Sequence, residues 1–355
     1  MTSQEFLYQY LNANAPVGAE SQGQQIWLNY VKNYTDSYII DTFGSVAAII
    51  NPEASYKVVI EAHADEISWF VHYITDDGYI YVIRNGGSDA LIAPSMKAHL
   101  HTKNGIVQGV FGWAAIHVRT DEKDDPKPEV KNIFIDIGCS SKDEVLALGV
   151  HVGTIVTFEG DLRELNNRYY VGRALDNRLG GYIIAEVARR LKENHVKLDY
   201  ALYVVNSVQE EIGLRGAEMM ARRIKPDVAV IVDVTHETHS PAYDKKKHGD
   251  IKAGKGAVIS YAPPIQAKLR DMLIEVAEKN QIPIQRQASS RTTGTDTDSF
   301  AYANFGTPAA LISIPLKYMH TTVEMAHKDD VEAVIRLFYE FLVQFKAGYD
   351  FQYFH

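Results

Sequence analysis

Acidic residues and histidines that could hold metal ions recur in five short segments of the chain. The segments are residues 62–66, 175–177 and 209–211, Asp233, and residues 319–320. Each one follows a predicted strand or begins a predicted helix, which is where α/β folds place their ligand sites. Carboxylate and imidazole ligands without thiolate suit zinc, cobalt or manganese at a catalytic centre better than a structural zinc. Together the segments predict a hydrolase with two metal ions.

His63 and Asp65 stand at the end of a strand predicted for residues 56–62. Strand side chains alternate, so residues two apart share one face. One of the two could bind a metal while the other orients it, because a carboxylate that accepts the second ring N–H of a ligating histidine fixes its tautomer. Taken alone, the pair fits a packed histidine beside a surface acid equally well.

Asp176 precedes a helix that the spacing of Leu179, Ile183, Val187 and Leu191 predicts. A helix N-cap is the commonest use of Asp at such a position, and for Asp176 alone the cap is favoured. A carboxylate has two oxygens, however, and could bridge two cations about 3.5–4 Å apart. The neighbouring arginines at 173 and 178 could balance charge or lie at the surface.

Glu210 and Glu211 follow an apolar strand and precede a predicted helix. Adjacent side chains point in different directions, so one carboxylate could ligate a metal while the other moves the proton of an attacking water. The alternative is two acids in the first turn of a helix, which the helix dipole stabilises. For the pair by itself this alternative is favoured.

Asp233 follows the apolar strand predicted for residues 228–232, and His320 follows a strand that ends before residue 315. Either one alone is more typical of a loop acid or a packed imidazole. The joint pattern at the carboxyl ends of strands is what favours a metal centre. His236, His239 and Arg291 could line the pocket. The spacing of His236 and His239 is three residues, not the four of a zincin helix.

Composition limits the class of protein. The chain has 355 residues, 23% of them charged and 46% hydrophobic, which is typical of a folded domain with a second, smaller one. The formal charge of −9 argues against nucleic acid as a partner. No stretch approaches the ~18 apolar residues of a membrane span, and no secretory signal is visible. Cys139 is the lone cysteine. These features predict a cytoplasmic protein with no membrane partner.

The chain shows two different patterns of predicted elements. Before residue 68 and after residue 167, predicted helices and strands alternate, which indicates an α/β fold with a mostly parallel sheet flanked by helices. Residues 68–167 are instead short apolar runs separated by turns, which indicates a small β domain. We therefore expect a discontinuous catalytic domain, residues 1–67 and 168–355, interrupted by the β segment 68–167.

Seven motifs carry a family resemblance along nearly the whole chain. They are residues 63–66 (His-Ala-Asp-Glu), 174–178 (Ala-Leu-Asp-Asn-Arg), 209–217, 233–235, 254–256 (Gly-Lys-Gly), 294–296 (Gly-Thr-Asp) and 318–320 (Tyr-Met-His). In this order they resemble the M42 family of metallo-aminopeptidases, the TET or glutamyl aminopeptidase-like enzymes. The resemblance implies a zinc-exopeptidase-like fold in which the inserted β-barrel-like segment is a dimerisation domain. It also implies a homo-oligomer whose dimers assemble into a dodecamer.

The resemblance implies roles for single residues as well. Five would be metal ligands, with Asp176 bridging two divalent ions: His63, Asp176, Glu211, Asp233 and His320. His63 and Asp233 would complete one ion, and Glu211 and His320 the other. Zinc is the first expectation, with cobalt or manganese as alternatives.

Glu210 would be the general base and Asp65 would orient His63. The expected activity is removal of N-terminal residues from short peptides by a water that bridges the two ions. One alternative is another two-metal amidohydrolase on the same scaffold, such as a deacylase or a carboxypeptidase. A glycosidase is disfavoured because it usually works with two metal-free carboxylates. A further alternative is a catalytically silent assembly or binding protein, against which the intact Glu210 argues.

Overall fold

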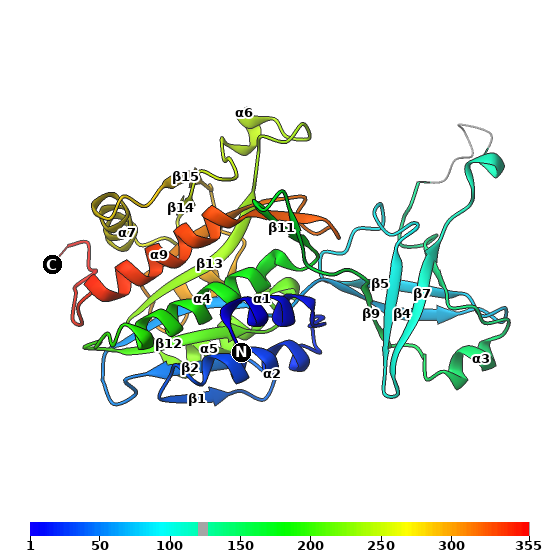
Figure 1. Ribbon diagram of the computed structural model, residues 1–355, viewed down its shortest axis with the longest axis horizontal. Helices are drawn as coiled ribbons and strands as arrows, with labels where there is room; N and C mark the ends of the chain where they lie inside the picture. The colour runs from blue at the N-terminus through cyan, green and yellow to red at the C-terminus, as the bar shows by residue number, and fades with distance from the viewer. Residues whose placement is uncertain (120–126, 355) are drawn as a thin grey trace.

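The protein has two parts of different architecture. The computed structural model describes residues 1–119 and 127–354. Figure 1 shows an α/β body that holds the N-terminus and the C-terminal region, and a barrel that projects from it. The chain leaves the body after β3 (Lys57–His63) to enter β4 (Ser68–Ile74). It returns between β9 (Ile155–Phe158) and β10 (Arg163–Leu165). The barrel is therefore inserted between two halves of the body.

A single large sheet forms the centre of the body. Its main path runs β1-β2-β12-β3-β13-β16-β17-β11-β10, with β14 and β15 branching from β16. The bounds are Ser37–Ile40 (β1), Val46–Ile50 (β2), Ala201–Ser207 (β12), Val228–His236 (β13), Ala309–Lys317 (β16), Glu324–His327 (β17), Tyr169–Gly172 (β11), Ala257–Tyr261 (β14) and Ile284–Ala288 (β15). The four central strands, β12, β3, β13 and β16, run parallel. The strands that flank them on the main path pair antiparallel.

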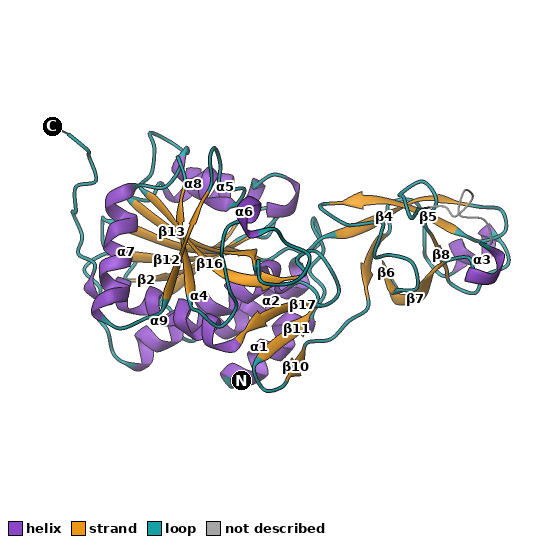
Figure 2. Ribbon diagram, turned by 90° about the horizontal axis from the view of Figure 1, so that it is seen from above, coloured by secondary structure: helices purple, strands orange, loops and turns teal. Residues whose placement is uncertain are grey.

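Helices cover both faces of this sheet, as Figure 2 shows. One face packs against α1 (Ser3–Asn12), α2 (Ser21–Val31), α4 (Leu175–Glu193), α7 (Ala267–Lys279) and α9 (Lys328–Gln344). The other packs against α5 (Arg215–Ile224) and α8 (Asp296–Ala301). Alternation along β3 explains the two layers, because Val58 and Ile60 join the first core and Val59 the second. Among the described helices, none is long and apolar enough to cross a membrane.

The inserted part is a closed barrel with its own core. Its strands follow the order β4-β5-β8-β7-β6-β9. The remaining bounds are Ile80–Asn85 (β5), Lys97–Thr102 (β6), Gly105–Gly112 (β7) and Phe134–Asp136 (β8), with α3 at Lys142–Ala147. The rings of Trp69, Phe111 and Phe158 pack together inside. The predicted fold class is confirmed: an α/β body with a helix-flanked sheet, plus a small β barrel.

One strand differs from its prediction in a way that concerns the site. Asp233 does not end its strand, because β13 continues to His236. The reason lies in the partner strand, since residues 233–236 still pair with β16 from Ser313 to Leu316. On the other side, the pairing of β13 with β3 stops at Ile231. Asp233 therefore projects from the middle of a paired strand.

Candidate metal centre

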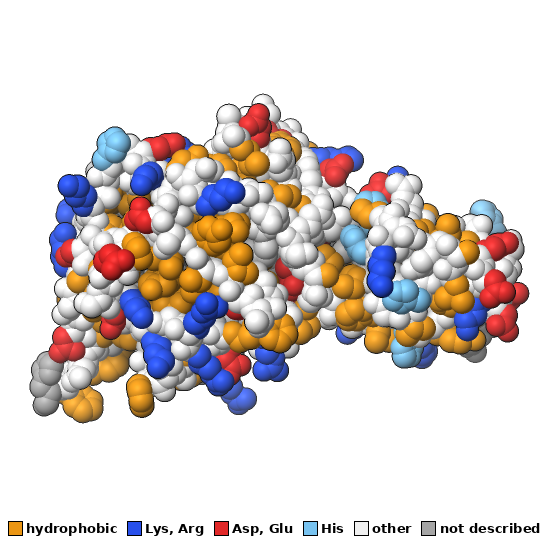
Figure 3. All heavy atoms as spheres, turned by 90° about the horizontal axis from the view of Figure 1, so that it is seen from below, with side chains coloured by type: hydrophobic (Ala, Val, Ile, Leu, Met, Phe, Trp, Pro, Cys, Tyr) orange, Lys and Arg blue, Asp and Glu red, His pale blue; other side chains and the backbone are white. Residues whose placement is uncertain are grey.

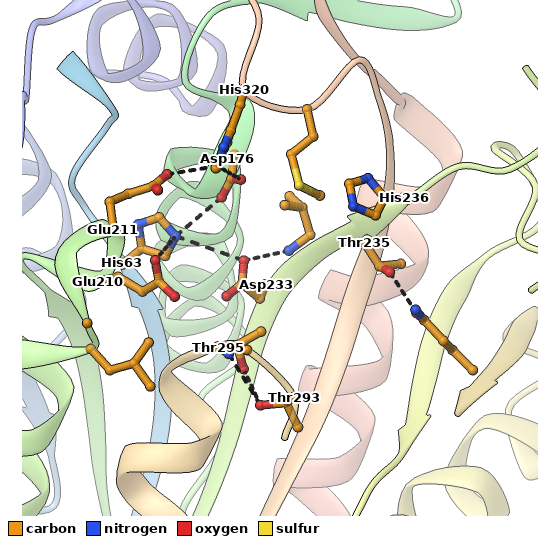
Figure 4. A pocket seen from close by; sticks show the side chains of 16 residues that line it. His63, Asp176, Glu210, Glu211, Asp233, Thr235, His236, Thr293, Thr295 and His320 are labelled. Atoms are coloured by element: carbon orange, nitrogen blue, oxygen red, sulfur yellow. Dashed lines mark hydrogen bonds and ion pairs between the residues drawn. The ribbon is translucent and has the colours of Figure 1, made fainter. Parts of the chain in front are cut away.

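The predicted ligands meet in one cleft at the carboxyl edge of the parallel strands. The cleft has a volume of about 500 Å³. Its lining includes His63, Asp176, Glu210, Glu211, Gly213, Leu214, Asp233, Val234, Thr235, His236, Gln287, Thr293, Gly294, Thr295, Met319 and His320. Figure 4 shows that the acids and the two predicted histidine ligands converge on one another. The residues predicted from five distant segments thus share one site.

Two of the predicted ligands, His63 and Asp233, come directly from neighbouring strands. β3 pairs with β13 so that Glu61 faces Ile231. His63 and Asp233 each lie two residues further along, at the same level and on the same face of the sheet. The Nε2 atom of His63 lies 3.9 Å from Oδ1 of Asp233. Both side chains are buried. Strand register alone therefore brings this pair together.

Asp176 lies between the two histidines. Its Oδ1 is 3.3 Å from Nε2 of His63, and its Oδ2 is 3.3 Å from Nε2 of His320. The same nitrogen of His320 is 3.3 Å from Oε1 of Glu211. Asp176 is no helix cap: Ala174 holds the N-cap position of α4 and makes no side-chain cap bond. Each oxygen of Asp176 thus faces a different histidine.

Glu210 and Glu211 occupy a single 3₁₀ turn, η2 (Glu210–Ile212), that follows β12. Gln209, directly before it, has a left-handed backbone with φ of 59°. The N–H groups of Glu210 and Glu211 donate to the two oxygens of Asp65, each at 3.0 Å. Oδ1 of Asp65 also lies 3.4 Å from Nδ1 of His63. Asp65 therefore holds the backbone of the Glu210–Glu211 turn in addition to lying beside His63.

The electrostatics of the cluster fit cations. Burial raises the pKa of Glu210 to about 10, and Asp233 adds to the rise. Burial likewise raises the pKa of Asp233 and of Glu211. Burial alone would lower the pKa of His320, but Asp176 and Glu211 outweigh it and raise that pKa to about 11. Burial thus favours the protonated form of Glu210, Asp233 and Glu211, whereas at Asp176 burial is outweighed by His320 and His63, which hold the pKa of that carboxyl below its usual range. Bound cations would neutralise this crowded acidic site.

The donor atoms are close enough for metal coordination. In the described residues two groups each have ligand atoms within 4.8 Å of one another: His63 with Asp176 and Glu211, and His63 with Glu210 and Asp233. Oxygen and nitrogen donors of this kind suit zinc, cobalt or manganese. The residues therefore fit a divalent metal.

Sequence reasoning did not single out two residues that shape the site. Glu324 in β17 is buried and accepts N–H bonds from both Asp176 and His320. A side-chain carbon on Gly87 would come within 2.7 Å of the His320 ring, so a larger residue there would force the ring to move. Gly87 sits on the barrel side of the chain, just past β5. Neither residue carries a spacing signal, because both act through contacts distant in sequence.

The arginines and further histidines considered from the sequence lie in different environments. Arg173 and Arg178 are buried and both pair with Glu66, so they are not surface residues. His236 lines the cleft as considered. His239 is absent from the lining and bonds Asp250 instead.

The comparisons with known proteins agree with this geometry. Residues 44–337 match the model of the M42 glutamyl aminopeptidase family. The chain belongs to the M42 aminopeptidase family. It is therefore a hydrolase, and the M42 peptidases are metal-dependent.

Similar proteins span nearly the whole chain. A lysyl aminopeptidase of Pyrococcus furiosus is 35% identical over 95% of this chain and 96% of its own length. A TET aminopeptidase of Thaumarchaeota archaeon SCGC AB-539-E09 is 28% identical, with a TM-score of 0.92 over 97% of both chains. The TET1 peptidase of Pyrococcus horikoshii, described as able to assemble into a tetrahedron or an octahedral shell, is 27% identical. Its TM-score is 0.84 over 97% of this chain and 100% of its own.

Proposed function

We propose that this M42 protein is a two-metal aminopeptidase that removes N-terminal residues from short peptides. His63 and Asp233 would complete one ion, Glu211 and His320 the other, and Asp176 would bridge them. The observation that carries the proposal is the position of Asp176, whose two oxygens each lie 3.3 Å from a different histidine. Zinc is the metal proposed first, with cobalt or manganese as alternatives.

We assign the general base to Glu210. Two bound divalent ions would supply Lewis acidity and lower the pKa of water near the peptide carbonyl. Oε2 of Glu210 lies 3.8 Å from Nε2 of His63, beside the ligands and facing the cleft. Cations nearby would lower its raised pKa, because opposite charge favours the ionised carboxylate. Glu210 would then take the proton of the attacking water and deliver it to the leaving amine.

The cleft favours a free N-terminus. Four carboxylates line it, Asp176, Glu210, Glu211 and Asp233, and the charged α-amine of a peptide would be attracted to them. An N-acetylated peptide lacks that charge. A deacylase or a carboxypeptidase would not require a free α-amine on its substrate. The response to acetylation therefore separates the aminopeptidase from its alternatives.

For assembly we propose a homo-oligomer built through the barrel segment 68–167, with dimers forming a dodecamer. Figure 3 shows apolar side chains and histidines exposed on the barrel. Large apolar side chains there include Leu91, Ile116, Val118 and Val152, each more than 60% exposed. Exposed apolar surface of this kind is typical of an interface. A cytoplasmic location, suggested by the lone Cys139, belongs to the same proposal.

The test is release of free amino acids from matched unblocked and N-acetylated peptides. Wild type loaded with zinc, cobalt or manganese should cleave only the unblocked series. Glu210→Gln should lose roughly 100-fold to 10,000-fold in kcat while retaining metal, since a positioned base contributes about that much. Glu275→Gln, an exposed acid on α7, is the matched control and should behave as wild type. Cleavage of the acetylated series would favour a deacylase, and no release with any metal would favour a silent binding protein.

A further inference from the structure

Glu324 joins the irregular first turn of α4, which carries Asp176, to the loop that carries His320. Its Oε2 accepts the backbone N–H of Asp176 at 3.1 Å, and its Oε1 accepts the N–H of His320 at 2.7 Å. The residue is 2% exposed. It stands at the start of β17, which pairs with β16 and β11. A single buried carboxylate thus ties together two segments far apart in sequence.

The backbone is irregular at both places that Glu324 holds. His320 lies in the loop between β16 and β17 with φ of 62°, and Tyr318 in the same loop has φ of 58°. Ala174, two residues before Asp176, has φ of 57°. Residues other than glycine adopt this backbone at a cost and keep it only where the surroundings impose it. The hydrogen bonds that Asp176 and His320 donate to Glu324 are contacts that hold this backbone in place.

We propose that Glu324 is a positioning residue that sets the spacing of Asp176 and His320 and so tunes metal affinity. This inference rests on the ligand set of the proposed function. Residues that orient metal ligands without touching the metal typically change affinity or activity by 10-fold to 100-fold when they are replaced. A glutamine cannot substitute, because its amide nitrogen would face an N–H donor.

Asp330 offers a matched control in the same chain. It is fully buried on α9 and accepts the N–H groups of Gly254 at 2.6 Å and Gly256 at 2.7 Å. Its two oxygens thus make the same kind of paired contact as those of Glu324. Gly254 and Gly256 do not line the metal cleft. Asp330→Asn therefore removes an equivalent contact without touching the ligands.

The experiment compares Glu324→Gln, Glu324→Asp and Asp330→Asn with wild type in metal-free, fully folded protein. Zinc affinity is measured by competition with a chelator, and cobalt coordination by its visible absorption. Glu324→Gln should lower zinc affinity by about 10-fold to 100-fold and alter the cobalt spectrum. Asp330→Asn should lower thermal stability but keep wild-type affinity and spectrum. Glu324→Asp, which keeps both oxygens, should recover part of the lost affinity.

Unchanged affinity in Glu324→Gln would overturn the inference even if its stability fell, because Glu324 would then be purely structural. An equal loss of affinity in Asp330→Asn would overturn it as well. If wild type bound no divalent ion, the ligand set of the proposed function would fail, and this inference with it. The wild-type titration distinguishes the two failures.

A separate observation, the rest of the cleft lining, concerns substrate choice. Apart from the proposed ligands and Glu210, the lining residues described carry no formal charge near pH 7. Burial lowers the pKa of His236, which keeps that ring neutral. Gln287 contributes an amide whose oxygen accepts the hydroxyl of Thr235 at 2.6 Å. Leu214 and Met319 add apolar surface.

We infer that the enzyme prefers uncharged N-terminal side chains over glutamyl or lysyl ones, an inference that rests on the proposed function. A buried charged side chain needs a partner of opposite charge, and this lining offers none beyond the metal ligands. The test is kcat/KM for leucyl, glutamyl and lysyl peptides of otherwise identical sequence. Wild type should favour the leucyl peptide at least tenfold over both others. Gln287→Glu should raise the lysyl-to-leucyl ratio severalfold.

A wild type that favours the glutamyl or lysyl peptide would overturn this second inference while leaving the aminopeptidase itself in place. An unchanged ratio in Gln287→Glu would also overturn it, because position 287 would then lie away from the substrate side chain. Absence of cleavage of all three peptides would be a failure of the proposed function instead.

Discussion

The two halves of the proposed metal centre are built in different ways. His63 and Asp233 project from paired parallel strands, and the register of β3 and β13 places them at one level. Glu211 and His320 lie in a turn and a loop, and Asp176 at an irregular helix start. Strands fix a side chain by the same hydrogen bonds that form the sheet, whereas loops need separate contacts. We expect the loop half to depend on residues that bind no metal.

Buried carboxylates supply those contacts. Asp65 accepts the N–H groups of Glu210 and Glu211, and Glu324 accepts those of Asp176 and His320. The barrel contributes as well, since Gly87 packs against the His320 ring. In the strand half, Asp65 also lies beside His63, with its Oδ1 3.4 Å from Nδ1 of the ring. The difference teaches that strand pairing places His63 and Asp233, whereas the residues in turns and loops are held by hydrogen bonds to buried carboxylates.

The largest effect is expected from Asp176→Ala, which removes the connection between the two halves. Loss of both ions would remove several kcal/mol of charge stabilisation, or roughly 1,000-fold in rate or more. Metal content and peptide hydrolysis measure the result, with Asp271→Ala on the surface of α7 as the control. Retention of both ions in Asp176→Ala would show that the halves bind metal independently.

Gly87→Ala tests whether the barrel side supports the loop half. The added carbon would meet the His320 ring at 2.7 Å and force it to move. A misplacement near 1 Å in a reacting site can cost about 100-fold in rate. Gly160→Ala is the matched control, because its added carbon would only touch Arg173 at 3.9 Å. Equal activity of the two variants would mean that His320 tolerates the shift.

The strand half and the loop half also differ in how much of each could be predicted from the sequence. The apolar strands, the helical spacing of α4 and the turn-rich barrel segment were readable because local pattern decides them. The strand-end position of His63 was readable too. Asp176 alone favoured a cap, and the contacts of Glu324 and Gly87 left no local trace. Such contacts depend on tertiary packing between distant segments, which periodicity does not encode.

A smaller effect is expected from Asp65→Asn. One of its two N–H acceptors is lost, so the Glu210–Glu211 turn should loosen and kcat/KM should fall about 10-fold to 100-fold. Asp41→Asn is the control, since Asp41 also accepts backbone N–H groups, from Phe43, Gly44 and Ser45, in a surface turn. Wild-type kcat/KM in Asp65→Asn would show that the turn keeps its shape without this acceptor.

The smallest effect on activity is expected from Asp330→Asn, because Asp330 bonds Gly254 and Gly256 and no proposed metal ligand. Loss of an N–H acceptor should cost about 1–3 kcal/mol of stability at pH 7 with kcat/KM unchanged. Burial raises the pKa of Asp330 to about 6, well above the ordinary value near 3.9. The folded state therefore binds this proton more tightly than the unfolded chain between about pH 4 and 6. Its contribution to stability is full below about pH 4 and declines as the pH rises through 6.

Denaturant unfolding of metal-free wild type and Asp330→Asn between pH 4 and 8 checks this sign. The stability of wild type relative to the variant should decrease from pH 4 to about 6 and then stay level. A difference that instead grows with pH would mean that the N–H groups of Gly254 and Gly256 hold the ionised carboxylate more strongly than burial opposes it. In that case the stabilisation by Asp330 would depend on its negative charge, and the comparison with Glu324 would have to be made at one fixed pH.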